Sequence, residues 1–223
     1  MTVKFRLSYN LSKNTPLYGG IGKIDFPYEK NINNGDTCNT HNLFFNNHAG
    51  THIDAPYHFD NYGKKICDYN IDDFIFNRPA VIEIPKKAGE LLISNDLKND
   101  DILKRCCNAD LILIKTGFGK FRGIEDYYLR NPGISESAIN FIRENFKSVR
   151  CLGIDTISVS SFMHREEGRK SHRAALQCNP EILLIEDMNL MEINSSMNIK
   201  KVYCIPLFIE NIDASPVTVF AEL

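Results

Sequence analysis

The sequence contains no tryptophan and no apolar run near the ~18 residues that a transmembrane helix needs. The segment from Met1 to Leu7 includes two basic side chains and lacks the apolar core of a signal peptide. Internal repeats, linkers and low-complexity tracts are also missing. We therefore expect neither a membrane span nor a secretory leader, and we predict that the 223 residues form one domain over 1–223.

An excess of charge of either sign is also lacking. The 26 Lys and Arg residues nearly balance the 28 Asp and Glu residues, and the basic side chains form no stripe or polybasic segment. This pattern argues against a nucleic-acid partner and against binding to a membrane surface. Apolar residues make up 43% of the chain, which is enough for a hydrophobic core.

Paired cysteine motifs are absent as well. The seven Cys are odd in number and show no Cys-x-x-Cys spacing, although Cys106 and Cys107 are adjacent. We expect reduced thiols in a cytoplasmic protein, where free Cys residues mostly act as small buried hydrophobic side chains.

Histidine, by contrast, is concentrated in one stretch. Three of the six His lie between positions 47 and 59, together with one Asp: His48, His52, Asp54 and His58. Imidazoles and a carboxylate at short spacing suit a divalent metal ion. In a fully extended chain the Cα atoms of His48 and His52 would lie ~13 Å apart, which is too far for one ion. The backbone must therefore bend between them, and Gly50 permits the bend.

The residues after the bend divide into ligands and a chemical partner. Asp54 lies two positions after His52, so an extended segment places both side chains on one face. Pro56 constrains the chain beyond them, and His58 follows close enough to reach a water on the ion without binding the ion. We predict that His48, His52 and Asp54 bind the metal and that His58 is not a ligand but contacts a water bound to the ion.

Hydrophobic periodicity predicts a mixed α/β domain in which strands outnumber helices. Leu111 to Ile114 is a continuous apolar run, which is typical of a buried parallel strand. Ser135 precedes an amphipathic helix that extends to about Lys147. The other predicted strands are 3–9, 43–45, 80–84, 151–154, 182–185, 202–207 and 216–222, and the other predicted helical segments are 72–76, 95–106 with Asn95 as its N-cap, and a short one from 169.

Two later polar segments are candidates for the same site. His172 lies in the helical segment that begins at 169, and Glu186 directly follows a predicted strand, so the two could complete a metal site. The charged segment 164–169 is interpreted as a mobile polar loop that could cover the site. The glycines at 117 and 119 lack the spacing of a phosphate-binding motif.

The segment His48-Ala49-Gly50-Thr51-His52-Ile53-Asp54-Ala55-Pro56 resembles the His-x-Gly-Thr-His-x-Asp-x-Pro signature of the cyclase family of metal-dependent hydrolases, which includes bacterial kynurenine formamidases and isatin hydrolases. Further segments resemble the family along nearly the whole chain: Leu11-Ser12 to Tyr18, Gly35 to Asn39, Thr116 to Gly119, Gly153 to Ser158, His172-Arg173 with Glu186, and Asp213 to Val217. The chain departs from the family pattern at Thr218, where Arg is common, and at Tyr18, where kynurenine formamidases tend to carry Trp. The spacing from His172 to Glu186 is also longer than in the family.

The resemblance implies an α/β fold of the swivelling β/β/α type, a single compact domain with a β-rich, barrel-like core and flanking helices. It also implies a homo-oligomer, either a homodimer or a homotetramer, with sites near subunit contacts. The ligand set that it implies comprises His48, His52 and Asp54 for one ion and Asp54, His172 and Glu186 for a second, with His58 as general acid and base. We expect Zn²⁺, as one or two ions, and Mn²⁺ suits the same ligands.

These residues lead to the hypothesis of metal-assisted hydrolysis of a carbon–nitrogen amide bond, in an arylformamide or a cyclic amide. The ion would lower the pKa of a water that attacks the carbonyl, and His58 would pass the proton to the leaving nitrogen. Thr51 would form hydrogen bonds around the site. Tyr18 and Phe59 would flank an apolar or aromatic small-molecule substrate.

Three alternatives remain open at this stage. Two His and one carboxylate could form the facial triad of a non-haem Fe(II) oxygenase, although that triad needs no further His or Glu. The metal could be structural in a non-catalytic protein, although structural zinc is usually bound by four ligands rich in Cys. The His residues could also be ordinary core residues, although this spacing of three His, one Asp and one Gly rarely arises by chance.

Overall fold

Residues 3–223 are described by the structure, which is a computed structural model. The strands are β1 (Lys4–Arg6), β2 (Tyr28–Lys30), β3 (Thr40–His41), β4 (His52–Asp54), β5 (Ile75–Phe76), β6 (Pro79–Glu83), β7 (Leu91–Leu92), β8 (Leu111–Lys115), β9 (Gly133–Ile134), β10 (Cys151–Ile154), β11 (Leu183–Glu186), β12 (Lys201–Pro206) and β13 (Ala214–Glu222). The α-helices are α1 (Asp100–Cys106), α2 (Asp126–Leu129), α3 (Glu136–Asn145) and α4 (Arg165–Leu176), and short 3-10 helices include η1 (Tyr18–Gly20), η3 (Pro56–His58) and η8 (Phe162–His164).

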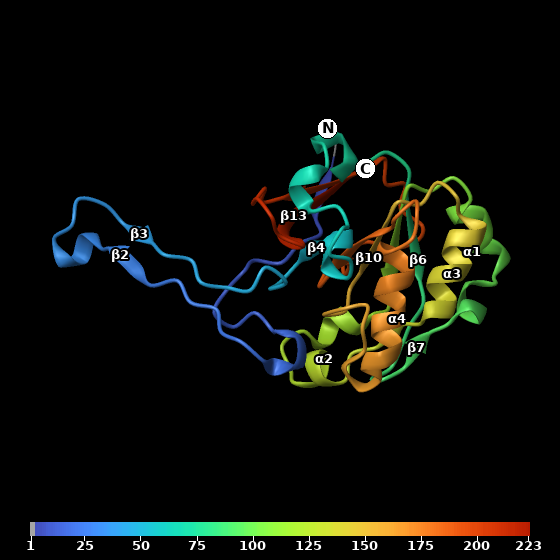
Figure 1. Cartoon of the computed structure of the whole chain (residues 1–223), viewed down its shortest axis with the longest axis horizontal. Helices are drawn as coiled ribbons and strands as arrows, with labels where there is room; N and C mark the ends of the chain where they lie inside the picture. Colours follow the sequence, from blue (N-terminus) through green and yellow to red (C-terminus); the bar gives the residue numbers. More distant parts are fainter. Residues whose placement is uncertain (1–2) are drawn as a thin grey trace.

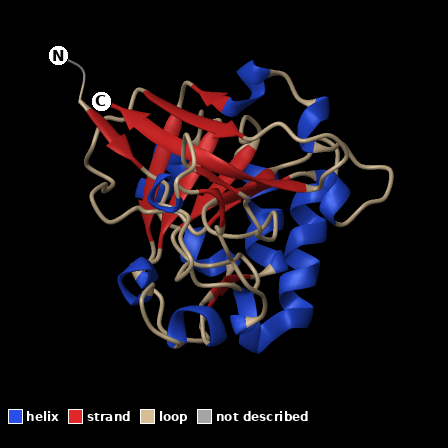
Figure 2. Cartoon of the chain, turned by 90° about the vertical axis from the view of Figure 1, so that its left-hand side faces the viewer, coloured by secondary structure: helices blue, strands red, loops and turns tan. Residues whose placement is uncertain are grey.

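One large mixed sheet organises the body of the molecule. Its strand order is β5-β12-β13-β4-β11-β10-β8-β6, and β1 is a ninth strand that pairs antiparallel with β13. The pairs from β6 through β8 and β10 to β11 are parallel, whereas β4 is antiparallel to both β11 and β13. The sheet curves into a barrel-like core, with the longer helices packed along one side (Figure 2). This arrangement confirms the predicted α/β fold class.

The strand β8 shows why its sequence is apolar throughout. Ile112 and Ile114 pack into the cluster that lies under the helices, whereas Leu111 and Leu113 pack into the cluster inside the curved sheet. Both faces of the strand are therefore covered, and complete burial of each such side chain contributes about 1.5–3 kcal/mol. The prediction of a buried parallel strand is confirmed.

The predicted helices differ in accuracy. The helix after Ser135 is confirmed as α3, and the Ser135 side chain accepts a hydrogen bond from the backbone N–H of Ala138. The helix predicted from 95 instead begins at Asp100, because the Asn99 side chain caps it and two Asp residues occupy its first turn. The segment Ser94–Leu97 forms a separate 3-10 turn.

The predicted mobile loop over 164–169 is wrong. This segment forms the end of η8 and the first turns of α4. Glu166 and Glu167 lie in the first turn of α4, where negative charge stabilises a helix. The short strand predicted at 43–45 is reduced to a single bridge between Asp25 and Phe44.

Residues 25–44 extend away from the body as a long hairpin, which we call the hairpin arm (Figure 1). Strands β2 and β3 pair antiparallel within it. Its exposed apolar side chains are Tyr28, Ile32, Leu43 and Phe44.

The cysteine prediction holds in part. All seven Cys are free thiols, and Cys106, Cys151 and Cys204 are buried as expected, whereas the other four are exposed. Within residues 3–223 no helix is both long enough and apolar enough to cross a bilayer.

Candidate active site

The site forms on the face of β4, which lies between β11 and β13 in the sheet. The register places His52 opposite Glu186 of β11 and places Asp54 opposite Ala214 of β13. Cross-strand partners and residues two apart share one face of a sheet, so His52, Asp54 and Glu186 converge. The Nε2 atom of His52 lies 3.4 Å from Asp54 Oδ1 and 3.4 Å from Glu186 Oε2.

The turn before β4 brings His48 to the same place. Gly50 has a φ of +72°, a left-handed conformation that side chains other than glycine adopt at a cost. The predicted bend is confirmed, and His48 Nδ1 lies 3.0 Å from Asp54 Oδ1.

Helix α4 supplies His172 from the far side of the cluster. Its Nε2 atom lies 3.4 Å from Glu186 Oε1 and 3.8 Å from Asp54 Oδ2. The ring of Phe59 stacks on the His172 ring with centroids 4.9 Å apart. The structure thus brings all five predicted metal ligands together, and Asp54 lies between the two groups of His.

Backbone carbonyls fix the orientation of two of these imidazoles. His52 Nδ1 lies 2.8 Å from the Gly50 carbonyl, and His172 Nδ1 lies 2.8 Å from the Gly168 carbonyl. Each Nδ1 therefore donates its proton to a carbonyl, and each Nε2 points into the cluster. Once Nε2 is deprotonated, each ring is in the state that a metal ligand requires.

Several buried atoms at the centre of the cluster have no hydrogen-bond partner within the described chain. They are His52 Nε2 and both carboxylate oxygens of Asp54, which is fully buried; His48 Nδ1 lies 3.0 Å from Asp54 Oδ1 without forming a hydrogen bond to it. A buried polar atom without a partner costs about 1–3 kcal/mol, and more when it is charged. A cation at this point would satisfy all three atoms, so the residues fit a divalent metal.

The charges of the cluster also favour a cation. Burial alone would lower the pKa of His48, but the carboxylates of Asp54 and Asp213 outweigh it and raise that pKa to about 10. Burial would raise the pKa of Glu186, but His172 and His52 hold it well below its ordinary value. The carboxylates thus remain ionised and attract either protons or a metal ion to the imidazoles.

Asp213 is a further member of the site that the sequence did not assign. Its Oδ2 atom lies 2.6 Å from His58 Nδ1 and 2.8 Å from His48 Nε2, and Asn47 Nδ2 donates to its Oδ1 at 2.7 Å. Burial would raise the pKa of this carboxyl, but His48 and His58 lower it strongly. Asp213 directly precedes β13, and its neighbour Ala214 pairs with Asp54, so only the sheet register reveals its place.

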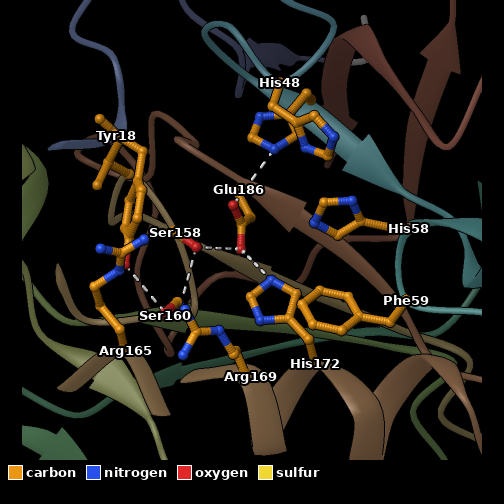
Figure 3. A pocket seen from close by; sticks show the side chains of 12 residues that line it. Tyr18, His48, His58, Phe59, Ser158, Ser160, Arg165, Arg169, His172 and Glu186 are labelled. Carbon is orange, nitrogen blue, oxygen red and sulfur yellow. Dashed lines mark hydrogen bonds and ion pairs between the residues drawn. The ribbon is translucent and has the colours of Figure 1, made fainter. Parts of the chain in front are cut away.

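The cluster opens into a pocket of about 240 Å³ (Figure 3). Tyr18 and Phe59, the predicted substrate contacts, both line its wall. The Tyr18 hydroxyl lies 3.1 Å from Ser160 Oγ. Lining residues that were not predicted are Ile157, Ser158, Ser160, Arg165 and Arg169.

Hydrogen bonds behind the cluster hold its strands in place. Thr51 Oγ1 donates to the carbonyl of Asp187, the residue after Glu186, and accepts from the N–H of Tyr9. Arg122 forms a two-bond contact with the Asp187 carboxylate in the interior. The expected hydrogen-bonding role of Thr51 is confirmed.

This donor set differs from the two alternative metal sites. It contains three His and two carboxylates, where a facial triad needs two His and one carboxylate. The candidate metal clusters found in residues 3–223 contain no Cys, unlike most structural zinc sites.

Comparison with known proteins places these features in context. Residues 5–161 match the model of the family described as putative cyclase. Kynurenine formamidase from Geobacillus thermodenitrificans (strain NG80-2) is 26% identical over 212 residues, which cover 95% of this chain and 93% of that protein. Kynurenine formamidase from Bacillus mycoides (strain KBAB4) is 31% identical over 148 residues, or 65% of each protein. Isatin hydrolase A from Labrenzia aggregata, solved with benzyl benzoate, is 19% identical and has the same fold, with a TM-score of 0.81 over 100% of this chain and 94% of that one.

Proposed function

The chain belongs to the putative cyclase family, and on this basis we propose that it is a metal-dependent hydrolase that cleaves a carbon–nitrogen amide bond in a small arylformamide or cyclic amide. The observation that carries the proposal is that three buried atoms able to bind a metal, His52 Nε2 and the two carboxylate oxygens of Asp54, have no hydrogen-bond partner within the described chain. The His58–Asp213 pair beside it provides a base for the reaction. Two relatives named kynurenine formamidase support the choice of a formamide.

Five residues would hold the metal. His48, His52 and Asp54 would bind one ion, and Asp54, His172 and Glu186 would bind a second, with Zn²⁺ as the expected metal and Mn²⁺ as one that the same ligands suit. A divalent ion bound there supplies Lewis acidity and makes water a stronger nucleophile at neutral pH.

His58 would carry the proton during the reaction. Asp213 accepts a hydrogen bond from Nδ1 of His58, which leaves Nε2 of the ring as the base. This nitrogen would take a proton from the attacking water and return it to the nitrogen that leaves the carbonyl. The negative charge of Asp213 stabilises the imidazolium that exists between the two transfers.

The walls of the pocket would bind and orient the substrate. Phe59, fixed by its stacking on His172, and Tyr18, fixed by its hydrogen bond to Ser160, provide aromatic surfaces on two sides. The pocket volume of about 240 Å³ is below the ~300–1,000 Å³ of pockets that hold drug-sized ligands, so a small substrate is expected.

Metal analysis combined with an activity panel tests the proposal. The purified protein, reconstituted with Zn²⁺ or Mn²⁺, should contain at least one ion per chain by mass spectrometry and should hydrolyse N-formylkynurenine, formanilide, isatin or another cyclic amide. Removal of the ion with a chelator should abolish that activity, and addition of the ion should restore it. Tight metal binding without hydrolysis of any of these compounds would instead support a structural metal.

His58→Ala tests the assigned base. The variant should retain its metal and lose roughly 10²–10⁴-fold in kcat, which is the usual contribution of a general acid or base. His41→Ala, which removes an exposed His from β3 on the hairpin arm, should leave kcat unchanged. An unchanged rate for His58→Ala would show that this residue is not the base.

We also propose that the protein is a cytoplasmic homodimer or homotetramer. The seven free thiols fit a reducing compartment. The hairpin arm exposes apolar side chains well away from the body, and exposed apolar surfaces of this kind often mark protein contacts (Figure 1). Light scattering should give a multiple of the 25.5 kDa chain mass, and the monomer mass alone would contradict the proposal.

A further inference from the structure

The proposed reaction leaves one end of the pocket unexplained. The His residues and Glu186 occupy one end, whereas Tyr18, Ser160 and two arginines occupy the other (Figure 3). The arginines, Arg165 and Arg169, have no part in metal binding or in proton transfer.

Helix geometry directs both arginines toward the site. Arg165, Arg169 and His172 are separated by four and three residues on α4, so they share one face of the helix. Gly168 allows this helix to approach the pocket closely, because a Cβ at that position would collide with Ser160 Oγ. The same face of the helix therefore positions His172 at the metal cluster and the two guanidinium groups at the opposite end.

The two guanidinium groups are available to a ligand. Arg165 forms no ion pair with any carboxylate of residues 3–223, and its guanidinium carbon lies 5.6 Å from the centre of the Phe162 ring. Among the described residues Arg169 pairs only with Glu166, whose side chain is 83% exposed on the same helix. Ion pairs of this exposed type are weak and are readily exchanged.

Acidic residues near the arginines do not cancel their charge within the pocket. The carboxylate of Glu167 accepts a hydrogen bond from the backbone of Glu136 on α3, so it faces away from the pocket. Glu186 is held between His52 and His172 at the other end. The Arg165 and Arg169 end of the pocket is therefore electropositive.

We propose that the substrate carries a carboxylate group, which Arg165 and Arg169 bind while the amide bond lies at the metal cluster. A guanidinium group presents two parallel N–H donors that match a planar carboxylate. The hydroxyls of Ser160 and Tyr18 lie on the same side and are hydrogen-bonded to each other, so one of the two can donate to the carboxylate (Figure 3). This inference rests on the proposed function and narrows its substrate class to small anionic amides.

Matched substrates test the inference. The three formamidobenzoates, with the carboxylate ortho, meta or para to the formamide, are compared with the corresponding neutral formamidobenzamides. At least one carboxylate isomer should be hydrolysed with a higher kcat/KM than its carboxamide counterpart. In the double variant Arg165→Gln/Arg169→Gln the ratio of the two kcat/KM values should fall by about 30-fold or more, as expected for the loss of hydrogen bonds to a charged group.

Lys170→Gln provides the control, because it removes the same charge from the same helix at an exposed position that does not line the pocket. This variant should keep the wild-type ratio. An unchanged ratio in the double variant, or equal losses for Lys170→Gln, would overturn the inference.

Binding of the aminobenzoates by calorimetry separates the two proposals. Binding that depends on Arg165 and Arg169, without hydrolysis of any formamide, would sustain the carboxylate site and refute the hydrolase. A second outcome is that the carboxamides are hydrolysed at the same kcat/KM as the carboxylates and that the affinity for aminobenzoates is unchanged in the double variant. This outcome would sustain the hydrolase and refute the carboxylate site.

Discussion

Replacement of Asp213 by Asn tests whether the carboxylate of Asp213 positions the imidazole of His58 for catalysis. The change keeps the size of the side chain but removes its charge and turns one oxygen into an amide donor. Asp213 Oδ2 faces two imidazole nitrogens, on His48 and His58, and Oδ1 faces the amide donor of Asn47. In one orientation the N–H group of the new amide would point at the Asn47 donor, and in the other it would face the two imidazole nitrogens, which could accept it only after a change of tautomer.

The expected loss can be worked out from these contacts. Hydrogen bonds to a charged group contribute about 1.5–3 kcal/mol, and about 1.4 kcal/mol changes a rate tenfold. One such interaction lost in the transition state lowers kcat by roughly 10- to 100-fold. A further loss is expected because the ring of His58 is no longer held in one tautomer, so we expect a decrease of at least about 100-fold.

The assay measures kcat, KM and metal content together on the best substrate of the panel. Asp213→Asn should lower kcat with little change in KM, and it should retain the metal because the ligands at His52, His172 and Glu186 are intact. Asp72→Asn, at an exposed position, is the matched control and should behave like the wild type. A kcat within about twofold of the wild type, with the metal in place, would refute the role assigned to Asp213.

Two further predictions follow from the turn and the charges of the site. Gly50→Ala should destabilise the protein by about 1–2 kcal/mol, because φ is +72° and the new Cβ would lie 3.2 Å from Leu11 Cδ1. The melting temperature should fall by several degrees, and metal affinity should weaken. An unchanged melting temperature would contradict this prediction. Nearby carboxylates raise the pKa of His48 to about 10, so at pH 7 an incoming ion must displace a proton from this imidazole, and they also raise the pKa values of His52 and His172. Metal affinity should therefore fall as the pH is lowered. Calorimetry in two buffers of different ionisation enthalpy should show the release of at least one proton, and heats that do not depend on the buffer would argue against this prediction. Without metal, the raised pKa of His48 stabilises the fold fully below pH ~6.5, and this contribution is lost as the pH rises through about 10.

The histidine motif could be predicted because its geometry is local. The position of His48 depends on one glycine turn, and the common face of His52 and Asp54 depends only on the period of an extended strand. The strands β8 and β10 could be predicted equally well, since their continuous apolar sequences already indicate burial on both faces.

Helix α4 was only partly predicted, because the helical segment expected from 169 lies within it but its first turn, 165–168, was assigned to a loop. Its buried face consists mostly of small or polar side chains, namely Gly168, Ser171, His172, Ala174 and Ala175, with Leu176 at the end. Such a face carries little apolar signal, so the charged residues at 164–169 suggested a loop.

The position of Asp213 depends on sheet register, which the sequence does not specify locally. The same register decides whether the site exists at all. Because side chains alternate along a strand, a shift of one residue between β4 and β11 would turn Glu186 away from His52 and onto the opposite face of the sheet. A similar shift between β4 and β13 would carry Asp213 away from His48 and His58.

The buried network around Asp187 opposes such shifts. Thr51 binds the carbonyl of Asp187 from the turn before β4, and Arg122 binds its carboxylate from outside the sheet. Breaking one partner of a buried ion pair typically costs about 3–5 kcal/mol, whereas the metal ligands gain their own stabilisation only when an ion binds. The interior hydrogen bonds can therefore set the register of β4 and β11 before the metal arrives, so that the ion meets a site already assembled from residues far apart in the sequence.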